Sequence, residues 1–586
     1  MVSKDKRLLV DNGCTSWRIV VGRDASPSEK HAADELQHFI KEISGVCIPV
    51  VDDACQIEEN EIILGNNSHL QQLGIDVDWA KLGDEGFIIK TVENKLVIAG
   101  GRLRGTIYGV YTFLEEYLGC RWLSSKVSYI PKRKVIEIPD IDDEQIPVLE
   151  YREPYYFDAF DGDWAVRNKC NSSFARLEEK HGKKLKYSRY FVHTFNKLVP
   201  VEEYFDTHPE YFSEVDGKRI SERTQLCLTN EDVFRIALER LREWIENEPD
   251  ATIFSVSQND WYNPCQCEKC REIDEREGSH SGTLLYFVNR IAEEIEKDYP
   301  DKYIDTLAYQ YTRKPPKYVR PRKNVIIRLC SIECCFSHPL EECNAISYPF
   351  YYRMSRKEIE NYTSFAQDLH EWSKITDRLY VWDYVTNFAN YIMPFPNFHV
   401  LQPNIKFMIR NNVKGIFEEG NYAKGGKGEF AELRAYVLAK LLWNPDYDVD
   451  LAIDEFLTGY YGNAAAPIRR YIDMLHKKVV DENIHMGIYD PPVNRYLSKD
   501  IMKKAEELFD RAEALADNEE ILERVRIARL PIEYVRLATM PLDTPGRDKM
   551  IEDFFAKLTE VGITEVREAR NLKTSEQAMK EGRLYL

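Results

Sequence analysis

The chain has 586 residues and a formal net charge of −19, and its composition is 44% hydrophobic and 30% charged. This length is more than one hydrophobic core supports, and it predicts roughly two to four domains. The negative charge argues against nucleic acid or an anionic membrane as partner, because a phosphate-rich surface requires a basic one. Aromatic residues make up 12% of the chain, with 35 Tyr and 9 Trp, an excess that suits stacking on sugar rings as well as core packing.

No apolar run approaches the roughly 20 residues of a membrane span. The N-terminal MVSKDKRLLVDNG lacks the apolar region of a signal peptide. We therefore expect a cytoplasmic protein as the chain is written, or a secreted or periplasmic one if a leader was trimmed, so localisation stays open. The 13 cysteines are an odd number scattered over a long chain, which indicates mostly buried, reduced thiols.

Residues 1–140 alternate strand and helix patterns and predict an α/β accessory domain. The SPSE motif beginning at Ser26 combines a capping box with proline at the first helical position, which predicts a helix start. The glycines near Gly100 lack the spacing of a dinucleotide or phosphate-binding loop, so they indicate a tight strand–helix turn. Strands are predicted at residues 17–21, 61–65, 86–89 and 95–100, and helices at 26–45 and 104–119.

Four segments of this domain are GRDASPSEKHAADELQHFIKEISG, EIILGNN, GFIIK and LVIAGGRLRGTIYGVYTFLEEYLGCRWL. They cover most of residues 1–125 and resemble the accessory domain that precedes the catalytic barrel in family 20 hexosaminidases, family 67 α-glucuronidases and family 84 enzymes. The resemblance implies that this domain braces a barrel and does no chemistry itself.

Residues 145–460 alternate strand-like and helical segments at the spacing of a (β/α)8 barrel. A large excursion, residues 205–230, interrupts the third unit, and a helix capped by Asn230 follows it. The predicted fold class is therefore α/β, with a central TIM-type barrel. The candidate strands are Val148–Phe157, Asn171–Arg176, Tyr190–His193, Ile253–Ser257, Ile304–Tyr311, Asn324–Cys330, Leu379–Trp382 and Gly415–Phe417.

Residues 465–586 are rich in Ala, Glu, Leu, Lys and Arg, and residues 503–516 and 519–540 carry helical periodicity. This pattern predicts a helical C-terminal domain. Its charges are most simply explained as a solvated face.

In a barrel, the chemistry lies where the strands end. The stretch TIFSVSQNDWYNPCQCEKC changes from an apolar run into a polar loop at Asn259, Asp260 and Trp261. A plain turn with solvent-facing side chains is the competing interpretation. Carboxylates interleaved with aromatic residues fit a site for glycosidic cleavage. The other strand ends carry Arg152, Glu153, Asp158, His193, Tyr309, Tyr311, Glu333, Trp382, Asp383, Tyr384, Glu418, Glu419, Asn421 and Tyr422.

Each of these residues also has a simpler explanation. A single Glu at a strand end is often a surface or salt-bridge residue. Glu418 and Glu419 cannot both face the barrel centre, because neighbours on a strand point to opposite faces. His193 in FVHTF is more often a hydrogen-bonded structural histidine than a catalyst. The convergence of several strand ends on one face favours the functional interpretation.

The cysteines Cys265, Cys267 and Cys270 have the spacing of a structural metal site, but a closed zinc site requires four ligands. A local disulfide or plain reduced thiols are the alternatives. No HExxH motif is present, so we expect no catalytic zinc and no cofactor for catalysis. The residues that could complete the set are Cys330, Cys334, Cys335, Cys343 or a histidine.

Residues 150–450 contain, in order, HTFNKL, EYFDTHPEYFSEVDGKR, QLCLTN, FSVSQNDWYNPCQCEKC, IIRLCSIECCFSHPL, YVWDYVTNF and GIFEEGNY. These segments resemble the catalytic region of glycoside hydrolase family 163, first known as a bacterial domain of unknown function. The resemblance implies endo-β-N-acetylglucosaminidase activity on complex N-glycans.

The resemblance further implies retaining hydrolysis, in which the 2-acetamido oxygen of the substrate attacks the anomeric carbon. On this basis Asn259 would polarise the acetamide and Asp260 would be the acid/base, with Glu333 as the competing acid/base. An Asn in place of a carboxylate would leave the developing positive charge without an anionic partner. The expected substrate-binding residues are Trp261, His193, Tyr309, Tyr311, Trp382, Asp383, Glu418, Glu419, Tyr422 and Arg152.

Two alternatives stay open. One is an α-glucuronidase-like inverting hydrolase, an arrangement that Glu333 and Asp383 would suit. The other is a non-catalytic carbohydrate-binding protein that kept the barrel and its aromatic residues. The expected partner is a glycan or oligosaccharide in each case, and the sequence defines no oligomeric state.

Overall fold

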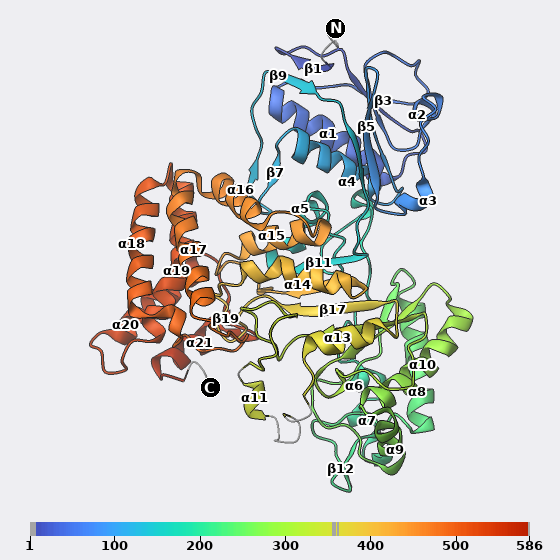
Figure 1. Ribbon diagram of the computed structural model, residues 1–586, viewed down its shortest axis with the longest axis vertical. Coiled ribbons are helices and arrows are strands. Elements are labelled where there is room, and N and C mark those ends of the chain that lie inside the picture. The colour runs from blue at the N-terminus through green and yellow to red at the C-terminus, as the bar shows by residue number, and fades with distance from the viewer. Residues whose placement is uncertain (1–6, 348, 354–358, 360–361, 584–586) are drawn as a thin grey trace.

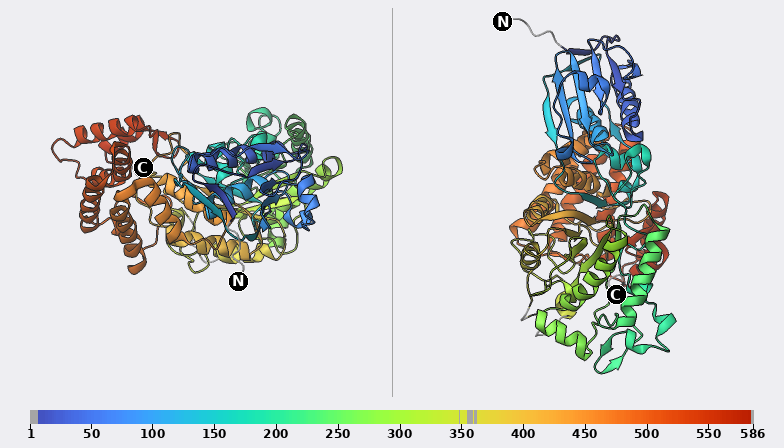
Figure 2. Two further views of the ribbon diagram at one scale, coloured as in Figure 1. Left: turned by 90° about the horizontal axis from the view of Figure 1, so that it is seen from above. Right: turned by 90° about the vertical axis from the view of Figure 1, so that its right-hand side faces the viewer.

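The computed structural model describes residues 7–347, 349–353, 359 and 362–583. An N-terminal sheet and its helices lie at one end of the long axis, a second sheet with its helices lies in the middle, and the C-terminal helices pack at one side (Figures 1 and 2). Among the described residues, no helix combines the length and the apolar character needed to cross a bilayer.

The N-terminal sheet has six strands in the order β10-β5-β6-β4-β2-β3. Helix α1 (Pro27–Ser44) begins with the predicted capping box on Ser26 and ends at Gly45, whose φ of 81° is left-handed. The predicted strands and the second helix, α4 (Gly105–Thr112), are also present. The strands are β2 (Arg18–Val21), β3 (Val50–Asp52), β4 (Glu61–Leu64), β5 (Phe87–Val92), β6 (Lys95–Gly100) and β10 (Asp142–Gln145).

The glycines between β6 and α4 serve a tight strand–helix turn, as predicted. A Cβ added to Gly100 would come within 2.5 Å of the carbonyl carbon of Gly105. No side chain fits between these two backbones, so the close packing of strand against helix explains both glycines.

The central sheet is a parallel half-barrel of six strands in the order β11-β18-β17-β16-β15-β14. Its first strand along the chain pairs with its last, as the two ends of a barrel do. Six of the eight predicted strands are therefore present. They are β11 (Tyr151–Tyr155), β14 (Ile253–Ser255), β15 (Tyr303–Ala308), β16 (Val325–Cys330), β17 (Leu379–Tyr384) and β18 (Val413–Glu419).

The strands predicted at residues 171–176 and 190–193 are wrong, and the eight-stranded barrel is not confirmed. Both segments are irregular, although the backbone N–H of Ser188 donates to the carbonyl of Ile253 at 2.9 Å. Here a side chain takes the place of the backbone hydrogen bonds between strands. The Thr194 hydroxyl donates to the Ser255 carbonyl and accepts from the N–H of Ser257, each at 2.9 Å. Hydroxyl residues that bond to nearby backbone compete with regular strand pairing.

Large side chains fill the concave face of this half-barrel. A buried cluster combines Tyr151, Ile326, Tyr380 and Phe417 from four strands with Tyr187 from the irregular segment. The convex face packs against helices, so residues of each strand alternate between an aromatic interior and an aliphatic helix-facing core. The covering helices are α8 (Glu231–Asn247), α10 (Ser281–Asp298), α14 (Phe398–Arg410) and α15 (Ala431–Trp443).

The C-terminal part is helical, with one small hairpin, β19 (Glu565–Arg567) and β20 (Arg570–Asn571). This hairpin contacts the central sheet region, because the backbone N–H of Glu568 donates to the carbonyl of Phe388 at 2.9 Å. The helices are α16 (Val449–Tyr461), α17 (Ala465–Asp481), α18 (Lys499–Leu515), α19 (Glu519–Ala538), α20 (Arg547–Glu560) and α21 (Leu572–Lys580).

Candidate functional site

The carboxyl end of the half-barrel presents a buried carboxyl group held by an indole. Glu419, the last residue of β18, accepts a hydrogen bond at 2.7 Å from Nε1 of Trp382 on the neighbouring strand β17. Trp382 also contacts the ring of Phe417, with centroids 4.6 Å apart, so both residues face the aromatic interior. Burial raises the pKa of Glu419 to about 8, and the charges of Glu568 and Asp260 contribute to this rise. Glu419 therefore carries a proton at neutral pH.

A second carboxylate, Asp260, follows β14 and is solvent-exposed. The hydroxyl of Tyr309 donates to Oδ1 of Asp260 at 3.0 Å, and Nε2 of Gln310 donates to the same hydroxyl at 2.8 Å. Gln310 adopts a left-handed φ of 51°, a conformation that costs a non-glycine residue on the order of 1 kcal/mol. The strained backbone thus holds the chain of hydrogen bonds that orients the Asp260 carboxylate.

A third carboxylate, Glu568, arrives from the C-terminal hairpin. It accepts from the hydroxyl of Tyr422 at 3.0 Å, and burial together with the charges of Asp260 and Glu565 raises its pKa. Tyr422 in turn packs against the ring of Tyr155, at 5.0 Å between centroids. Glu568 is not among the predicted site residues, because nothing in EVREARN indicates that a turn near the C-terminus would contact the half-barrel.

His193 lies beside this group in an unusual backbone conformation, with a φ of 54°. Its Nδ1 lies 2.8 Å from the carbonyl of Gln258, so Nδ1 carries the proton and Nε2 is an acceptor. Burial lowers the pKa of His193 and so favours the neutral ring. Its ring lies 6.1 Å from that of Tyr309, so the structure brings His193, Tyr309 and Asp260 together.

Asn259 does not point its amide at a substrate. Its Oδ1 accepts from the N–H of Asn196 at 3.0 Å, and its Nδ2 donates to the carbonyl of Thr224 at 2.9 Å. This geometry does not favour the expectation that Asn259 polarises an acetamide, which stays a prediction. Both polar atoms of Asn259 hold the loops on which Asp260 rests, and the residue is 6% exposed.

Glu333 is held in an ion-pair network. Its Oε2 accepts from Nη1 of Arg313 at 3.1 Å, and Nε of Arg313 donates to Asp368 at 2.8 Å. The Glu333 carboxylate is thus already engaged by a guanidinium that also binds Asp368. This geometry favours Glu419 over Glu333 as the acid.

Asp383 and Glu418 lie on the helix-facing side of the sheet, opposite to the interior residues Trp382 and Glu419. They are register partners on β17 and β18, and they are 2% and 1% exposed. Asp383 accepts from the Ser331 hydroxyl at 2.5 Å. Burial raises the pKa of Asp383 to about 6. Because strand neighbours alternate faces, this position does not favour the expectation that these two residues bind substrate.

Arg152 is also remote from the site. It is fully buried and pairs through Nη1 with Glu85 of the N-terminal sheet region at 2.8 Å, with Nε donating to the carbonyl of Lys169 at 2.9 Å. Desolvation opposes ionisation of Glu85, but Arg152 and Arg104 hold its pKa down at about 2. Arg152 therefore joins the N-terminal and central parts, a position that does not favour the expected role as a substrate ligand.

Trp261 and Tyr311, two of the expected substrate-binding aromatic residues, lie in different surroundings. Trp261 is 44% exposed next to Asp260, and the guanidinium of Arg223 lies 5.7 Å from its ring centroid, so it offers a surface on which a sugar could stack. Tyr311 instead packs against Tyr262 and His280, with centroids 5.7 and 5.8 Å away, beside the cysteine loop.

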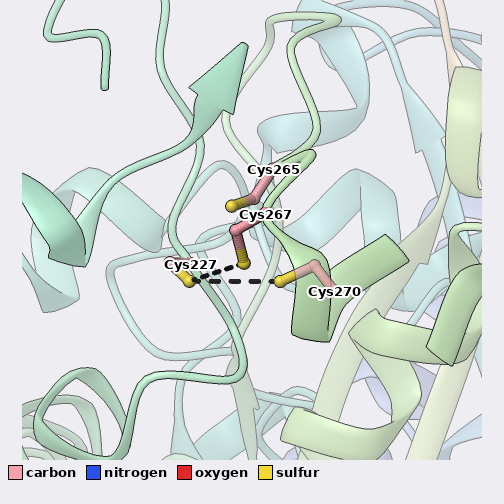
Figure 3. Close-up of side chains that lie close together, drawn as sticks. All are labelled: Cys227, Cys265, Cys267 and Cys270. Carbon is pink, nitrogen blue, oxygen red and sulfur yellow. Dashed lines mark hydrogen bonds between the residues drawn. The ribbon is translucent and has the colours of Figure 1, made fainter. Parts of the chain in front are cut away.

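Four cysteines meet behind this loop (Figure 3). Cys265, Cys267 and Cys270 are joined by Cys227, a residue that the sequence analysis did not include, and their sulfur atoms all lie within 4.8 Å of one another. Sγ of Cys227 is 3.7 Å from that of Cys267 and 4.0 Å from that of Cys270. Tetrahedral zinc with bonds of about 2.3 Å places thiolates about 3.8 Å apart, so the donor set and spacing fit a closed zinc site with four cysteine ligands.

The fold with its acid-lined, aromatic strand ends is of the type found in glycoside hydrolases. The chain belongs to the family described as Domain of unknown function (DUF4838), whose model matches residues 122–473. Residues 12–113 match the model of the glycosyl hydrolase family 67 N-terminus, in agreement with the resemblance of the accessory domain. No curated protein sequence matches the chain.

Solved structures of glycoside hydrolases are similar to this chain at low sequence identity. A family GH115 4-O-methyl-α-glucuronidase, BtGH115A, is 12% identical, with a TM-score of 0.59 over 99% of this chain and 80% of that one. A family 89 glycoside hydrolase from Clostridium perfringens is 10% identical, with a TM-score of 0.49 over 91% of this chain and 65% of that one.

Proposed function

We propose that this protein is a glycoside hydrolase whose site is the carboxyl end of the half-barrel. The observation that carries the proposal is the pair of acids in opposite environments. Glu419 is buried, with its pKa raised to about 8, whereas Asp260 is exposed and held by the Tyr309 hydroxyl. Glycosidic cleavage uses a protonated acid together with a second carboxylate.

Glu419 is the general acid in this proposal. Its proton would go to the glycosidic oxygen as the bond to the anomeric carbon breaks, and the Trp382 N–H would stabilise the carboxylate left behind. Asp260, held by the Tyr309 hydroxyl, would orient the nucleophile or the water at the anomeric carbon. Trp261 and the ring cluster of Tyr155, Phe417 and Trp382 provide surfaces for sugar faces.

For the substrate, we propose a glycan that is cut at N-acetylglucosamine, by an endo-β-N-acetylglucosaminidase reaction on N-glycans. The ordered segments that resemble family 163 support this substrate. The retaining, substrate-assisted route then gives Asp260 the role of orienting the 2-acetamido group, because both polar atoms of Asn259 are already bonded to backbone.

The second candidate is an inverting α-glucuronidase-like hydrolase. The likeness of the fold to the solved family GH115 4-O-methyl-α-glucuronidase favours it.

A substrate panel separates these candidates. The full chain and its E419Q variant are each incubated with a complex N-glycan and with a 4-O-methylglucuronic acid-bearing xylooligosaccharide, and products are identified by mass spectrometry. Cleavage of the N-glycan between its two core N-acetylglucosamines, absent with E419Q, supports the proposal. Release of glucuronic acid supports the second candidate. Binding without turnover of either glycan would leave a carbohydrate-binding protein and contradict catalysis.

We also propose that Cys227, Cys265, Cys267 and Cys270 hold a structural zinc ion. The site would join the excursion at residues 205–230 to the loop behind Asp260, because Cys227 comes from the first and the other three from the second. With four protein thiolates, no coordination position remains for substrate or water, so the ion would supply rigidity and no chemistry.

A further inference from the structure

A second group of metal-type donors lies in and around the loop that follows β16. Cys335, His338 and Cys343 come from this loop, and His485 comes from the segment after α17. Sγ of Cys335 lies 3.2 Å from Nδ1 of His338 and 3.3 Å from Nδ1 of His485, and Sγ of Cys343 lies 3.6 Å from Nδ1 of His485. All four donor atoms lie within 4.8 Å of one another.

These distances fit the edges of a tetrahedron around zinc. Bonds of about 2.3 Å to sulfur and about 2.0 Å to nitrogen place a thiolate and an imidazole nitrogen about 3.5 Å apart. Two cysteines and two histidines are also a donor set that zinc prefers for closed structural sites.

The surroundings of His338 supply an independent sign of metal ligation. Its Nε2 lies 3.0 Å from the side-chain oxygen Oδ1 of Asn483. An amide oxygen only accepts, so Nε2 carries the proton and Nδ1 presents its lone pair to the other three donors. Metal-binding histidines characteristically donate their second N–H to such an oxygen, which fixes the ring in place.

A disulfide does not explain the group. All thirteen cysteines are free thiols in the part of the chain that the structure describes, and a disulfide between Cys335 and Cys343 would leave the two histidines without a reason to converge on the sulfurs. Plain packing is also a weak explanation, because His485 is exposed and Cys343 is half-buried, where water competes for each polar atom.

We propose that Cys335, His338, Cys343 and His485 bind a second structural zinc ion, separate from the four-cysteine site. Four protein ligands leave no open position, so the ion would be a clamp and not a catalyst. It would join the loop that carries Glu333 to residues 483–490 of the C-terminal part. The backbone already brings these segments together, since the N–H of Phe336 donates to the carbonyl of Met486 at 2.9 Å.

Zinc content of the full chain tests the proposal. Inductively coupled plasma mass spectrometry measures the zinc content per chain of the purified wild-type protein and of two variants. The variants are the double variant Cys335→Ser/Cys343→Ser and the single variant His485→Cys. Cys14→Ser/Cys47→Ser is the matched control, because both of these cysteines are exposed and outside either group. We expect the Cys335→Ser/Cys343→Ser variant to lose one zinc per chain relative to wild type, and the control to lose none. H485C should keep the ion, because three cysteines with one histidine also form a closed zinc site.

The Cys227→Ser variant distinguishes the two sites, because it should lose only the zinc ion of the four-cysteine site. If the Cys335→Ser/Cys343→Ser variant fails to fold, anomalous diffraction at the zinc edge from wild-type crystals decides the matter. A peak bonded to all four side chains supports the proposal. An unchanged zinc content in the double variant, or no peak at the four donors, overturns it.

Discussion

The indole N–H of Trp382 donates to the Glu419 carboxyl group at 2.7 Å across two neighbouring strands. This bond favours the charged form of Glu419, while burial and the nearby charges of Glu568 and Asp260 favour the protonated form. The opposing effects give an acid that is protonated at neutral pH and has a hydrogen-bond donor ready for its conjugate base. This is the requirement for a general acid in glycosidic cleavage.

Substitutions of Trp382 and Glu568, which both act on the Glu419 carboxyl group, should shift the alkaline limb of the pH–rate profile in opposite directions. In wild type, kcat/KM should fall as pH rises through about 8, where burial and nearby charges place the pKa of Glu419. Trp382→Phe removes a donor to the charged form and should move the limb to higher pH, whereas Glu568→Gln removes a negative charge and should move it lower. Each shift should be roughly 0.5–1 pH unit. A shift of the alkaline limb in the same direction in both variants would contradict this account.

Glu419→Gln should lower kcat by about 10²–10⁴, the range that a general acid contributes. Glu418→Gln is the matched control, because the neighbouring carboxyl group is also buried but lies on the helix-facing side. Its activity should stay within about threefold of wild type, since it touches no group in the reaction. Equal losses in the two variants, measured as kcat on the same substrate, would show that the effect is structural.

Glu419→Gln should also stabilise the folded protein at mildly alkaline pH. Glu419 ionises in the unfolded chain near the ordinary glutamate pKa of 4.5 but keeps its proton in the fold up to a pKa of about 8. The folded state therefore binds more protons between these values, and the contribution of Glu419 to stability is full below about pH 4.5 and lost as pH rises to about 8. Glu419→Gln should raise the free energy of unfolding at pH 8 by about 4 kcal/mol, and by almost nothing at pH 4. Urea denaturation at both pH values measures this difference.

The sequence predicted much of the scaffold, because the signals were local. The capping box at Ser26, the glycines near Gly100 and the apolar runs of six barrel strands each depend on residues close in the chain. The strands predicted at residues 171–176 and 190–193 are irregular in the structure, and beside the second of them the Thr194 hydroxyl bonds to backbone that a strand would pair.

The site was less predictable, because it depends on contacts between distant segments. The sequence placed Asp260, Tyr309, Trp382 and Glu419 at strand ends, but not the side of the sheet to which each side chain points. The partners of Asn259 and Arg152, the backbone of Asn196 and the Glu85 side chain, could not be predicted because they are far from them in sequence. Glu568 lay 149 positions beyond Glu419 and had no pattern that could identify it.

Tyr309→Phe should lower kcat by roughly tenfold, because it removes the hydroxyl that donates to the Asp260 carboxylate. Tyr311→Phe is the control, since that ring packs against Tyr262 and His280 instead. Steady-state kinetics of both variants give the comparison. A larger loss in Tyr311→Phe would place the reaction nearer to the cysteine loop than to Asp260.

Arg152→Ala should destabilise the protein without changing substrate affinity. The substitution leaves the Glu85 carboxylate with one fewer cation in a buried environment, a change that costs about 3–5 kcal/mol when a buried pair is broken. Thermal denaturation should show a lower Tm, while KM of the folded fraction stays at the wild-type value. A raised KM with an unchanged Tm would restore Arg152 as a substrate ligand.

The proton that Glu419 gives to the leaving group is the central claim, and the dependence of rate on the leaving group tests it most directly. Wild-type and Glu419→Gln enzymes are compared on aryl glycosides of the cleaved sugar, with 2,4-dinitrophenol and 4-methoxyphenol as leaving groups. We predict that Glu419→Gln loses about 10²-fold or more on the 4-methoxyphenyl glycoside and little on the dinitrophenyl glycoside, which departs without a proton. An equal loss of rate on both substrates would contradict the assignment of Glu419 as the general acid.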